Sequence, residues 1–432
     1  MKKVISVLIV LLILFLAATV TLHFKGCGGD LLCEDSTAVE LPDIDDSLRM
    51  RIDTFLSAVP PCGDFGMMVY DITAQKEVYS YNKDSLMRPA SCMKILTCMA
   101  VLRYIGADKK QYNRLYTTGN IAGDTLRGDL ILKTQFDTSF NRDTLNLLVD
   151  TLKSMGIKHI SGNIVIDMAF TEAMDHEEHW IIGDLRTRYM GLVLQGFPRM
   201  RKELMGALYM KGIKLDGGDV LLGKLNPAIS QLVAENINTY HTMIEKALKV
   251  SSNINAEALL YPLGYIYDKK GNYRENGKLF LNNFLQRELN VIPAQVCNID
   301  DGCGLCPNDR VTPELLIRLL IYAHNHKSMY EEVLNDMPLA GVDGTLYKRM
   351  HHPEIKGKLR GKTGTLTREG GVSSLAGYFI GKDDHLIAYS IINNGCSVED
   401  GRAWQDEFCQ KAFRPYKYMG KLEEQVIENQ LE

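Results

Sequence analysis

Residues 356–364 read KGKLRGKTG, and two further apolar runs follow it, SLAGYFI at 374–380 and LIAYSIIN at 386–393. Turns that contain glycine or charged residues separate the three runs, a pattern typical of consecutive antiparallel strands. Near the other end of the chain, Phe65–Tyr70 and Lys76–Tyr81 flank a short polar connection and predict a hairpin. We expect the five strands to form one antiparallel sheet flanked by helices.

The hairpin is followed by a helical pattern. Ile95, Met99 and Leu102 recur at i, i+4 and i+7, and Gly106 comes soon after them. This spacing predicts a helix of about three turns that begins near Lys94 and ends at the glycine. Strands at both ends of the chain and helices between them indicate a mixed α/β (α+β) fold.

The stretch 111–245 differs from its flanks. Two strand-like segments enclose a helix whose leucines share one face, as expected for a small α+β unit of its own. We therefore predict an inserted domain at 111–245 within a larger domain made of 40–110 and 246–415. An acidic tail at 416–432 completes the chain.

Composition and charge exclude some functions. The chain has 432 residues, of which 46% are hydrophobic and 24% charged, in the range of packed globular proteins. The 49 Lys and Arg against 53 Asp and Glu give a formal net charge of −4. Such a chain lacks the basic field that holds nucleic acid, so we expect no nucleic-acid partner.

The N-terminus indicates the compartment. Lys2 and Lys3 precede an uncharged run, Val4–Leu22, which as a helix would reach roughly 30 Å, about one hydrocarbon core. Residues 1–25 are therefore a signal anchor or a cleaved signal peptide, and either alternative exports the body to the cell envelope. The ten cysteines are compatible with disulfides there, but the sequence does not give their pairing.

Ser91-Cys92-Met93-Lys94 places a hydroxyl and an amine three residues apart at the predicted helix start. Both side chains then lie on one helix face. Serine is a weak nucleophile until a base takes its proton, and lysine can do so when burial lowers its pKa. Ser91 and Lys94 are thus a candidate nucleophile and base. Such a pair needs no metal or organic cofactor.

Two further motifs follow in order. Ser251-Ser252-Asn253 lies just before a helical stretch, and Lys362-Thr363-Gly364-Thr365 lies at the end of the first C-terminal run. A glycine at a strand edge lets a ligand approach the backbone closely, and Lys and Thr offer a cation and hydroxyls for a carboxylate.

In this order the three motifs resemble the S-x-x-K, S-D-N and K-T-G set of penicillin-binding proteins and serine β-lactamases. The wider context resembles the low-molecular-mass class C penicillin-binding proteins, the D-alanyl-D-alanine carboxypeptidase/endopeptidases. The stretches that carry this likeness are Gly128-Asp129-Leu130, Ala256 to Leu260, Asp301 to Cys306, Arg310 to Pro313 and Ala340 to Leu346. The resemblance covers roughly residues 50 to 415. It implies a transpeptidase-like catalytic domain.

The resemblance also implies roles. Ser91 would be the acyl-accepting nucleophile and Lys94 its general base, while Ser251 would relay a proton to the leaving group with Lys362 tuning that relay. Backbone N–H groups of Ser91 and Thr365 would form the oxyanion hole.

Substrate binding is implied for the remaining motif residues. Asn253 would bind the amide backbone of the substrate. Thr363 and Thr365 would hold its terminal carboxylate, with Gly364 leaving room for it. The resemblance implies cleavage of D-Ala-D-Ala or a related bond in peptidoglycan stem peptides, with β-lactams as covalent inhibitors.

Three residues depart from the family pattern. Ser252 replaces the acidic residue of S-D-N, and Cys303 and Cys306 stand where the group usually has serines, which puts hydroxyl contacts from that loop in question. Ser91 and Ser251 are 160 positions apart (251 − 91), fewer than in long members with two inserted domains, so we expect a second insert to be lost or reduced.

Two alternatives remain open. A serine β-lactamase shares the motif chemistry but needs a base for its deacylating water, and no residue of the sequence identifies that base. A catalytically weak, membrane-tethered cell-wall binding protein would keep the fold and lose turnover.

Overall fold

The computed structural model describes residues 41–174, 180, 190–368 and 370–420. The described elements belong to one compact unit that begins at Pro42. The predicted anchor or signal segment, residues 1–25, lies outside the described residues, as does the tail from 421. Among the residues that are described, no helix has both the length and the hydrophobicity to cross a bilayer.

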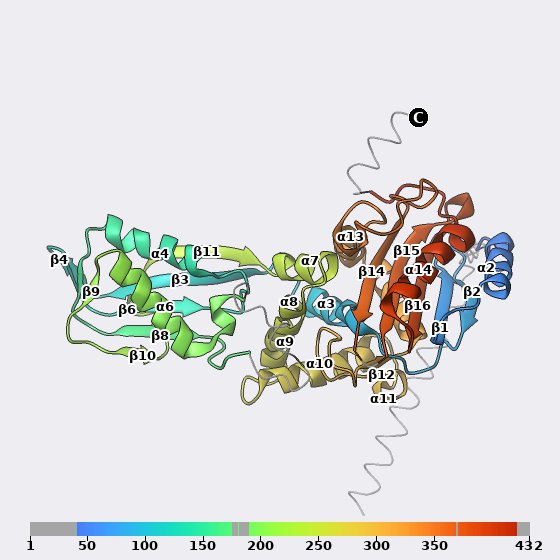
Figure 1. Cartoon of the computed structure of the whole chain (residues 1–432). Helices are drawn as coiled ribbons and strands as arrows, with labels where there is room; N and C mark the ends of the chain where they lie inside the picture. The colour runs from blue at the N-terminus through green and yellow to red at the C-terminus, as the bar shows by residue number, and fades with distance from the viewer. Residues whose placement is uncertain (1–40, 175–179, 181–189, 369, 421–432) are drawn as a thin grey trace, which may run out of the picture. The chain divides into compact units, whose positions relative to one another are not determined.

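The predicted five-stranded antiparallel sheet is confirmed. Its order is β14-β15-β16-β1-β2, and each neighbouring pair is antiparallel (Figure 1). The strands are β1 (Asp64–Asp71), β2 (Lys76–Tyr81), β14 (Leu359–Leu366), β15 (Val372–Ile380) and β16 (Leu386–Asn394). Nearly every residue of β15 and β16 is buried, on both faces, which explains why their sequences are continuously apolar and do not alternate.

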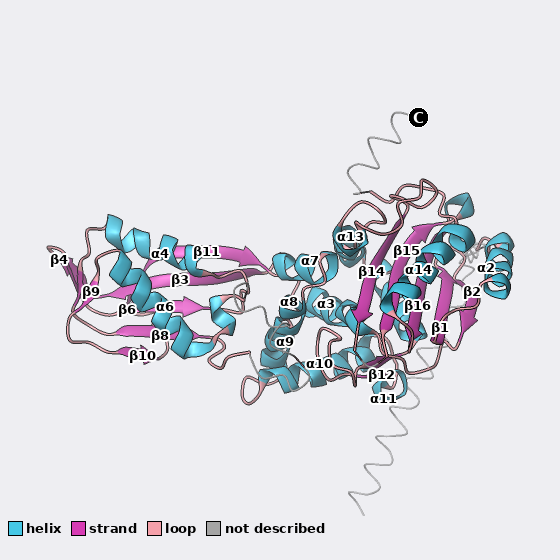
Figure 2. Ribbon diagram, viewed as in Figure 1, coloured by secondary structure: helices cyan, strands magenta, loops and turns pink. Residues whose placement is uncertain are grey.

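Helices cover both faces of this sheet (Figure 2). Adjacent serines of β15 identify the two faces: Ser373 Oγ donates to Gln405 of α14 (Val398–Phe408), whereas Ser374 Oγ donates to the carbonyl of Pro89, just before the predicted nucleophile. Alternation along the strand therefore separates the α14 face from the catalytic face. The other helices here are α2 (Asp46–Ala58), α3 (Met93–Tyr104), α10 (Tyr273–Glu288), α11 (Pro293–Val296), α12 (Pro313–His324) and α13 (Lys327–Asp336).

The last helix of the described residues is α14. Ser397 caps it, so it starts at Val398, and it continues as a π-helical turn over Cys409–Phe413. The start of the predicted acidic tail also packs on the domain: the Met419 carbonyl accepts a hydrogen bond from buried Arg360 of β14.

A second five-stranded sheet is built from residues 110–239, inside the predicted insert. Its order is β10-β8-β6-β3-β11; β10, β8 and β6 run parallel, and β3 is antiparallel to β6 and β11. In the described part of this segment, helices α4 (Arg142–Ser154) and α6 (Gly196–Met210) accompany the sheet and pack on each other (Figure 1). The strands are β3 (Lys110–Thr118), β6 (Leu130–Thr134), β8 (Ile164–Met168), β10 (Val220–Leu222) and β11 (Ser230–Thr239).

A four-stranded sheet lies in the same part of the chain. It consists of β4 (Asn120–Ala122), β5 (Thr125–Arg127), β7 (His159–Ile160) and β9 (Lys214–Leu215). Asp129, in one of the stretches that resemble the family, accepts the backbone N–H of Asn163 between two of the sheets. This stretch therefore serves the structure of the insert.

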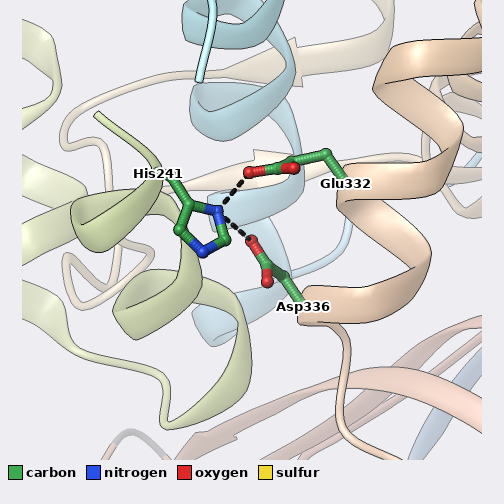
Figure 3. A group of neighbouring side chains, drawn as sticks. All are labelled: His241, Glu332 and Asp336. Atoms are coloured by element: carbon green, nitrogen blue, oxygen red, sulfur yellow. Dashed lines mark hydrogen bonds and ion pairs between the residues drawn. The ribbon is translucent and has the colours of Figure 1, made fainter. Parts of the chain in front are cut away.

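Strand β11 leads directly into three short helices, α7 (His241–Lys249), α8 (Asn253–Ala258) and α9 (Leu260–Tyr267). Helix α7 packs on α3 and α13. At its start His241 Nδ1 contacts the carboxylate of Glu332, with Asp336 3.9 Å away (Figure 3). Burial and the charge of Glu332 raise the pKa of Asp336 to about 7. This polar junction ties the exit of the insert to the helices beside the catalytic sheet.

Candidate active site

The predicted nucleophile lies at a strained turn. Residues Ala90–Cys92 form one turn of 3₁₀ helix that leads into α3, and Ala90 has φ +44°, in the left-handed region that non-glycine residues rarely adopt. The side chain of Asn394 holds the turn from the sheet: it accepts the Arg88 N–H at 2.8 Å and donates to the Arg88 carbonyl at 3.1 Å. Ser91 is thereby fixed at the start of the helix, partly exposed.

Lys94 lies one turn further and is fully buried. Its Nζ donates to Ser91 Oγ at 2.8 Å, to Asn253 Oδ1 at 2.8 Å and to the Cys303 carbonyl at 2.6 Å. The three acceptors come from three separate parts of the chain. Burial lowers the pKa of Lys94, because a low-dielectric site penalises the charged amine. The pair has the geometry in which an amine can take the serine proton.

A second lysine and serine pair faces the first. Lys362 Nζ donates to Ser251 Oγ at 2.8 Å and to the Thr363 carbonyl at 2.7 Å. Burial, followed by repulsion from Lys94, lowers the pKa of Lys362 to about 7. Ser251 itself has φ +57° in the connection between α7 and α8. Each predicted catalytic lysine thus contacts a predicted catalytic serine.

Helix α8 begins at Asn253 because Ser252 caps it. The Ser252 Oγ accepts hydrogen bonds from the backbone N–H and the side-chain amide of Asn255, at 3.4 and 2.8 Å. Serine is a preferred N-cap residue. Ser252, which replaces the aspartate of S-D-N, therefore caps the helix, and Asn253 contacts Lys94.

Strand β14 is the edge of the sheet nearest the nucleophile, and Gly364 permits that approach. A Cβ on Gly364 would lie 2.4 Å from the Pro89 carbonyl oxygen and 3.1 Å from the Ser91 nitrogen. Only glycine fits this contact without displacing one of the backbones. The K-T-G motif is therefore part of the strand and lies directly against the nucleophile turn, not at the strand's end as the sequence suggested.

The threonines of this motif have polar partners. Thr363 Oγ1 donates to Thr345 Oγ1 at 2.7 Å, and Arg402 Nη2 donates to Thr365 Oγ1 at 2.6 Å. Arg402 is not among the predicted site residues, because it lies outside the three motifs in the sequence. The buried Nε of Arg402 has no hydrogen-bond acceptor among the described residues. A guanidinium thus lies beside the predicted carboxylate site.

The loop after β12 (Cys297–Asn298) and before β13 (Arg310–Val311) positions the third acceptor of Lys94. Buried Asp301 accepts the backbone N–H groups of Cys303, Gly304, Leu305 and Cys306, at 2.5 to 3.1 Å. Burial by itself raises the pKa of Asp301, but hydrogen bonds from Asp309 and from this loop hold it below its ordinary value. One carboxylate therefore organises the whole turn.

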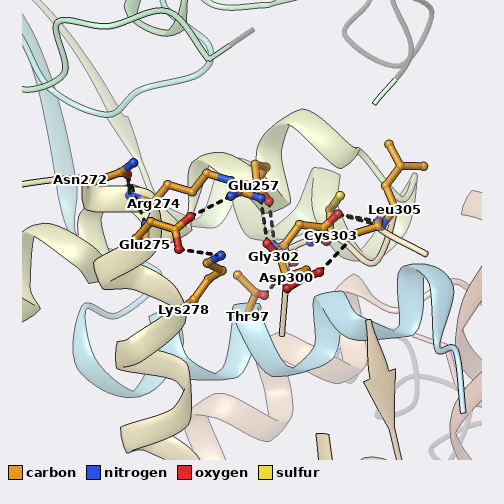
Figure 4. Close-up of polar contacts among 12 residues, drawn as sticks. Thr97, Glu257, Asn272, Arg274, Glu275, Lys278, Asp300, Gly302, Cys303 and Leu305 are labelled. Atoms are coloured by element: carbon orange, nitrogen blue, oxygen red, sulfur yellow. Dashed lines mark hydrogen bonds and ion pairs between the residues drawn. The ribbon is translucent and has the colours of Figure 1, made fainter. Parts of the chain in front are cut away.

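Neighbouring helices hold this loop as well (Figure 4). Thr97 Oγ1 of α3 donates to the Gly302 carbonyl at 2.7 Å, and the Gly302 N–H donates to Glu257 of α8 at 2.7 Å. Arg274 of α10 donates in turn to Glu257 at 2.5 Å. Burial, with the charge of Asp301 adding to it, raises the pKa of Glu257 to about 7.

The cysteine replacements leave this arrangement intact. Lys94 donates to the backbone carbonyl of Cys303, the Cys306 N–H donates to Asp301, and the Cys306 thiol donates to Asp300 at 3.4 Å. Burial raises the pKa of both thiols, that of Cys306 to about 12. No hydroxyl from the loop is needed for the contacts that Lys94 makes.

Among the described residues, possible metal ligands lie within 4.8 Å of one another in two groups: His241, Glu332 and Asp336, and Glu257, Asp301 and Cys303. The carboxylates of Glu257 and Asp301 accept hydrogen bonds from Arg274 and from backbone N–H groups. His241 contacts Glu332. In both groups the carboxylates therefore have protein partners, and these contacts join the neighbouring helices and the loop.

A cavity among the described residues lies away from the predicted catalytic residues. It has a volume of about 870 Å³, and Phe170, Trp180, Tyr261 and Arg274 are among its lining residues. No motif residue of the predicted site lines it. Arg274 connects its wall to Glu257 and so to the loop beside Lys94.

Asp301→Asn is expected to slow acylation of Ser91 by a β-lactam by about 100-fold or more, because a neutral amide with one acceptor oxygen cannot replace a carboxylate that accepts four N–H groups. Cys303→Ser is the matched control. It should keep the rate within about twofold, since the carbonyl that binds Lys94 is unchanged. Stopped-flow or quenched-flow acylation rates measure both. Equal losses in the two variants would contradict this account of the loop.

Comparison with known proteins identifies the family. The family model for D-Ala-D-Ala carboxypeptidase 3 (S13) matches residues 48–195 and 197–413. D-alanyl-D-alanine carboxypeptidase DacB of Haemophilus influenzae is 22% identical over 438 residues, which cover 82% of this chain and 90% of the relative. A D-alanyl-D-alanine carboxypeptidase of Actinomadura sp. (strain R39) is 32% identical over 232 residues, or 50% of this chain and 40% of that protein.

Solved structures share the fold. Penicillin-binding protein 4 of Haemophilus influenzae has a TM-score of 0.69 at 21% identity, with 83% of this chain and 99% of that chain covered. The peptidoglycan endopeptidase Bd3459 of Bdellovibrio bacteriovorus has a TM-score of 0.58 at 16% identity, with 83% and 95% covered. The penicillin-binding-protein fold expected from the sequence is confirmed. Since the family match spans most of the chain, this protein belongs to the D-Ala-D-Ala carboxypeptidase 3 (S13) family of serine peptidases.

Proposed function

We propose that this chain cleaves the D-Ala-D-Ala bond of peptidoglycan stem peptides through an acyl-enzyme on Ser91. The observation that carries the proposal is the buried amine of Lys94, 2.8 Å from Ser91 Oγ at the start of α3. A base within hydrogen-bond reach of a serine is the signature of nucleophilic catalysis. The second pair, Lys362 and Ser251, supplies a group for the leaving amine.

The proposed acylation step uses the hydrogen bonds between each lysine and its serine. Neutral Lys94 accepts the Ser91 proton as Oγ attacks the carbonyl carbon of the penultimate D-alanine. The oxyanion would be held by the N–H groups of Ser91 and Thr365, which lie on the two elements that Gly364 brings together. The terminal D-alanine leaves as an amine after it takes a proton through Ser251. A water molecule then hydrolyses the ester and restores Ser91.

The two lysines divide this work because they repel each other. Their mutual repulsion and burial disfavour two positive charges in the site. A group with a pKa of about 7, as Lys362 has, both gives and accepts protons near neutrality. Lys362 is therefore suited to pass a proton to Ser251 after Lys94 has taken one from Ser91.

Substrate binding would use the other motif residues. The side chain of Asn253 would bind the backbone amide of the stem peptide. The terminal carboxylate would lie against Thr363 and Thr365, where Arg402 provides the positive charge. A carboxylate gains most from a guanidinium that is partly desolvated and pre-positioned, as this one is.

Peptidoglycan lies outside the cytoplasmic membrane, so this function requires an envelope location. Attachment to the membrane through Val4–Leu22 stays a prediction. The retained contacts of Ser91, Lys94 and Lys362 support an active enzyme over a binding protein that has lost turnover.

Incubation with a β-lactam tests the mechanism. Intact-protein mass spectrometry should show one persistent adduct on the wild type and none on Ser91→Ala, because only an acyl-enzyme adds the drug covalently at Ser91. Ser80→Ala changes a half-buried serine of β2 that bonds to Glu77; it is the matched control and should acylate like the wild type. Failure of folded wild-type protein to acylate would refute the proposal, and rapid drug turnover with a transient adduct would indicate a β-lactamase.

The pH dependence of the acylation rate should follow the protonation of the two lysines, Lys94 and Lys362. The pKa of Lys362 is lowered to about 7 and burial lowers that of Lys94, so lowering the pH through this range adds a proton to the pair and disfavours the neutral amine that takes the Ser91 proton. The acylation rate is expected to rise with a midpoint near pH 7. Lys362→Arg keeps a positive charge throughout the range and should flatten that step. An unchanged step in Lys362→Arg would show that another group titrates there.

Arg402→Ala is expected to raise KM for a peptide ending in D-Ala-D-Ala by roughly 10- to 100-fold, the loss of one charge-assisted contact. The same peptide as a C-terminal amide should be affected little, because it carries no charge for Arg402 to bind. Arg402→Lys should restore part of the discrimination. An equal change in KM for the acid and the amide would show that Arg402 does not bind the substrate carboxylate.

A further inference from the structure

Two partly exposed cysteines lie at the ends of neighbouring strands. Cys62 comes two residues before β1, and Cys396 comes two residues after β16. These strands are antiparallel partners whose last paired residues are Asp64 and Asn394. Antiparallel neighbours have Cα atoms about 4.5 to 5.5 Å apart, within the range that a disulfide bridges.

The two chain segments stay in contact beyond the last pair. A Cβ on Gly63 would lie 3.2 Å from the Cys396 nitrogen, and Asn393 Nδ2 donates to the Cys62 carbonyl at 3.1 Å. The reduced thiols hydrogen-bond with each other, and burial together with this bond raises the pKa of Cys396 to about 12. The two cysteine side chains therefore lie close enough to interact.

The remaining described cysteines differ from this pair. They are buried, and they are Cys92, Cys98, Cys297, Cys303, Cys306 and Cys409. A buried thiol in a packed core behaves as a small apolar side chain. Cys62 and Cys396 combine mutual contact with access to solvent, which an oxidant needs.

We propose that Cys62 and Cys396 form a disulfide in the working enzyme. The proposal rests on the proposed function in one respect only, the envelope location, where disulfides form and persist. One thiolate attacks a disulfide oxidant, forms a mixed disulfide with one of its sulfurs and releases the other as a thiolate. The second cysteine thiolate then attacks the protein sulfur of this mixed disulfide and releases the oxidant's remaining sulfur. The Cys62–Cys396 bond forms, and the reduced oxidant leaves with both of its sulfurs as thiols, carrying away the two electrons and two protons.

The disulfide would hold together the ends of β1 and β16, from which two segments lead to the catalytic site. Cys396 directly precedes Ser397, the cap of α14, and this helix carries Arg402 to Thr365. On the strand side, Asn394 holds the backbone of Arg88 before the nucleophile turn. The disulfide would close a loop from residue 62 to residue 396, and so joins the first strand of the catalytic sheet to the end of its last.

Peptide mapping without reductant tests the proposal. The full chain, secreted into an oxidising compartment or incubated with glutathione disulfide, is denatured, alkylated and digested. We expect a cross-linked peptide pair containing Cys62 and Cys396 that disappears with dithiothreitol. Quantitative alkylation of both residues after oxidation, or a bond from either to another cysteine, would overturn it. The map needs no variant, so a folding defect cannot obscure the result.

Thermal unfolding gives the second readout. Reduction should lower the Tm of the wild type by roughly 5 °C or more, since a disulfide that closes so long a loop restricts the unfolded chain strongly. The double variant Cys62→Ser/Cys396→Ser should be insensitive to reductant, and an equal shift there would contradict the proposal. Acylation of Ser91 is measured on the same samples. A missing disulfide with normal acylation refutes this inference alone, and a disulfide without acylation refutes the proposed function alone.

Discussion

A buried lysine amine must find hydrogen-bond partners where water does not reach, and this requirement on Lys94 organises the catalytic centre. The three acceptors are the Ser91 hydroxyl, the Asn253 side chain and the Cys303 carbonyl. They belong to the nucleophile turn, to the helix that follows the insert and to the loop organised by Asp301. An unpaired charge at this site would cost several kcal/mol, so the three segments are held in one arrangement. The same burial lowers the pKa of Lys94 and makes the amine a base.

The sheet sets the second constraint. Edge strand β14 approaches the nucleophile turn closely because Gly364 has no side chain, and Lys362 of that strand reaches Ser251 from the opposite side. Two amines within one buried site repel, which favours the states with a single proton between them. Such a pair exchanges protons near neutrality without a metal-bound water. The geometry of one strand edge therefore serves both binding and proton transfer.

The inserted domain is connected to the catalytic site by the segment that follows its last strand. Strand β11 ends at Thr239, and α7 then packs on α3 and α13 and carries the chain to Ser251. Lys249 of α7 donates to the carbonyls of Asn335 and Met337 and to Asp343, so the end of this helix is anchored immediately before the catalytic serine. A displacement of β11 would act on Ser251 through this short rigid connection.

The sequence by itself determined the elements whose information is local. Apolar runs with turn residues predicted the five strands, and the i, i+4 spacing predicted the helix of Lys94. The three motifs, recognised from their order in the chain, predicted that Ser91, Lys94, Ser251 and Lys362 belong to one site, and the structure brings these residues together. Tertiary structure decided the contacts between distant segments, because no local pattern encodes them. The Cys303 backbone replaces any hydroxyl in binding Lys94, Arg402 reaches Thr365 from another helix, and Cys62 meets Cys396 only because β1 and β16 are neighbours in the folded sheet.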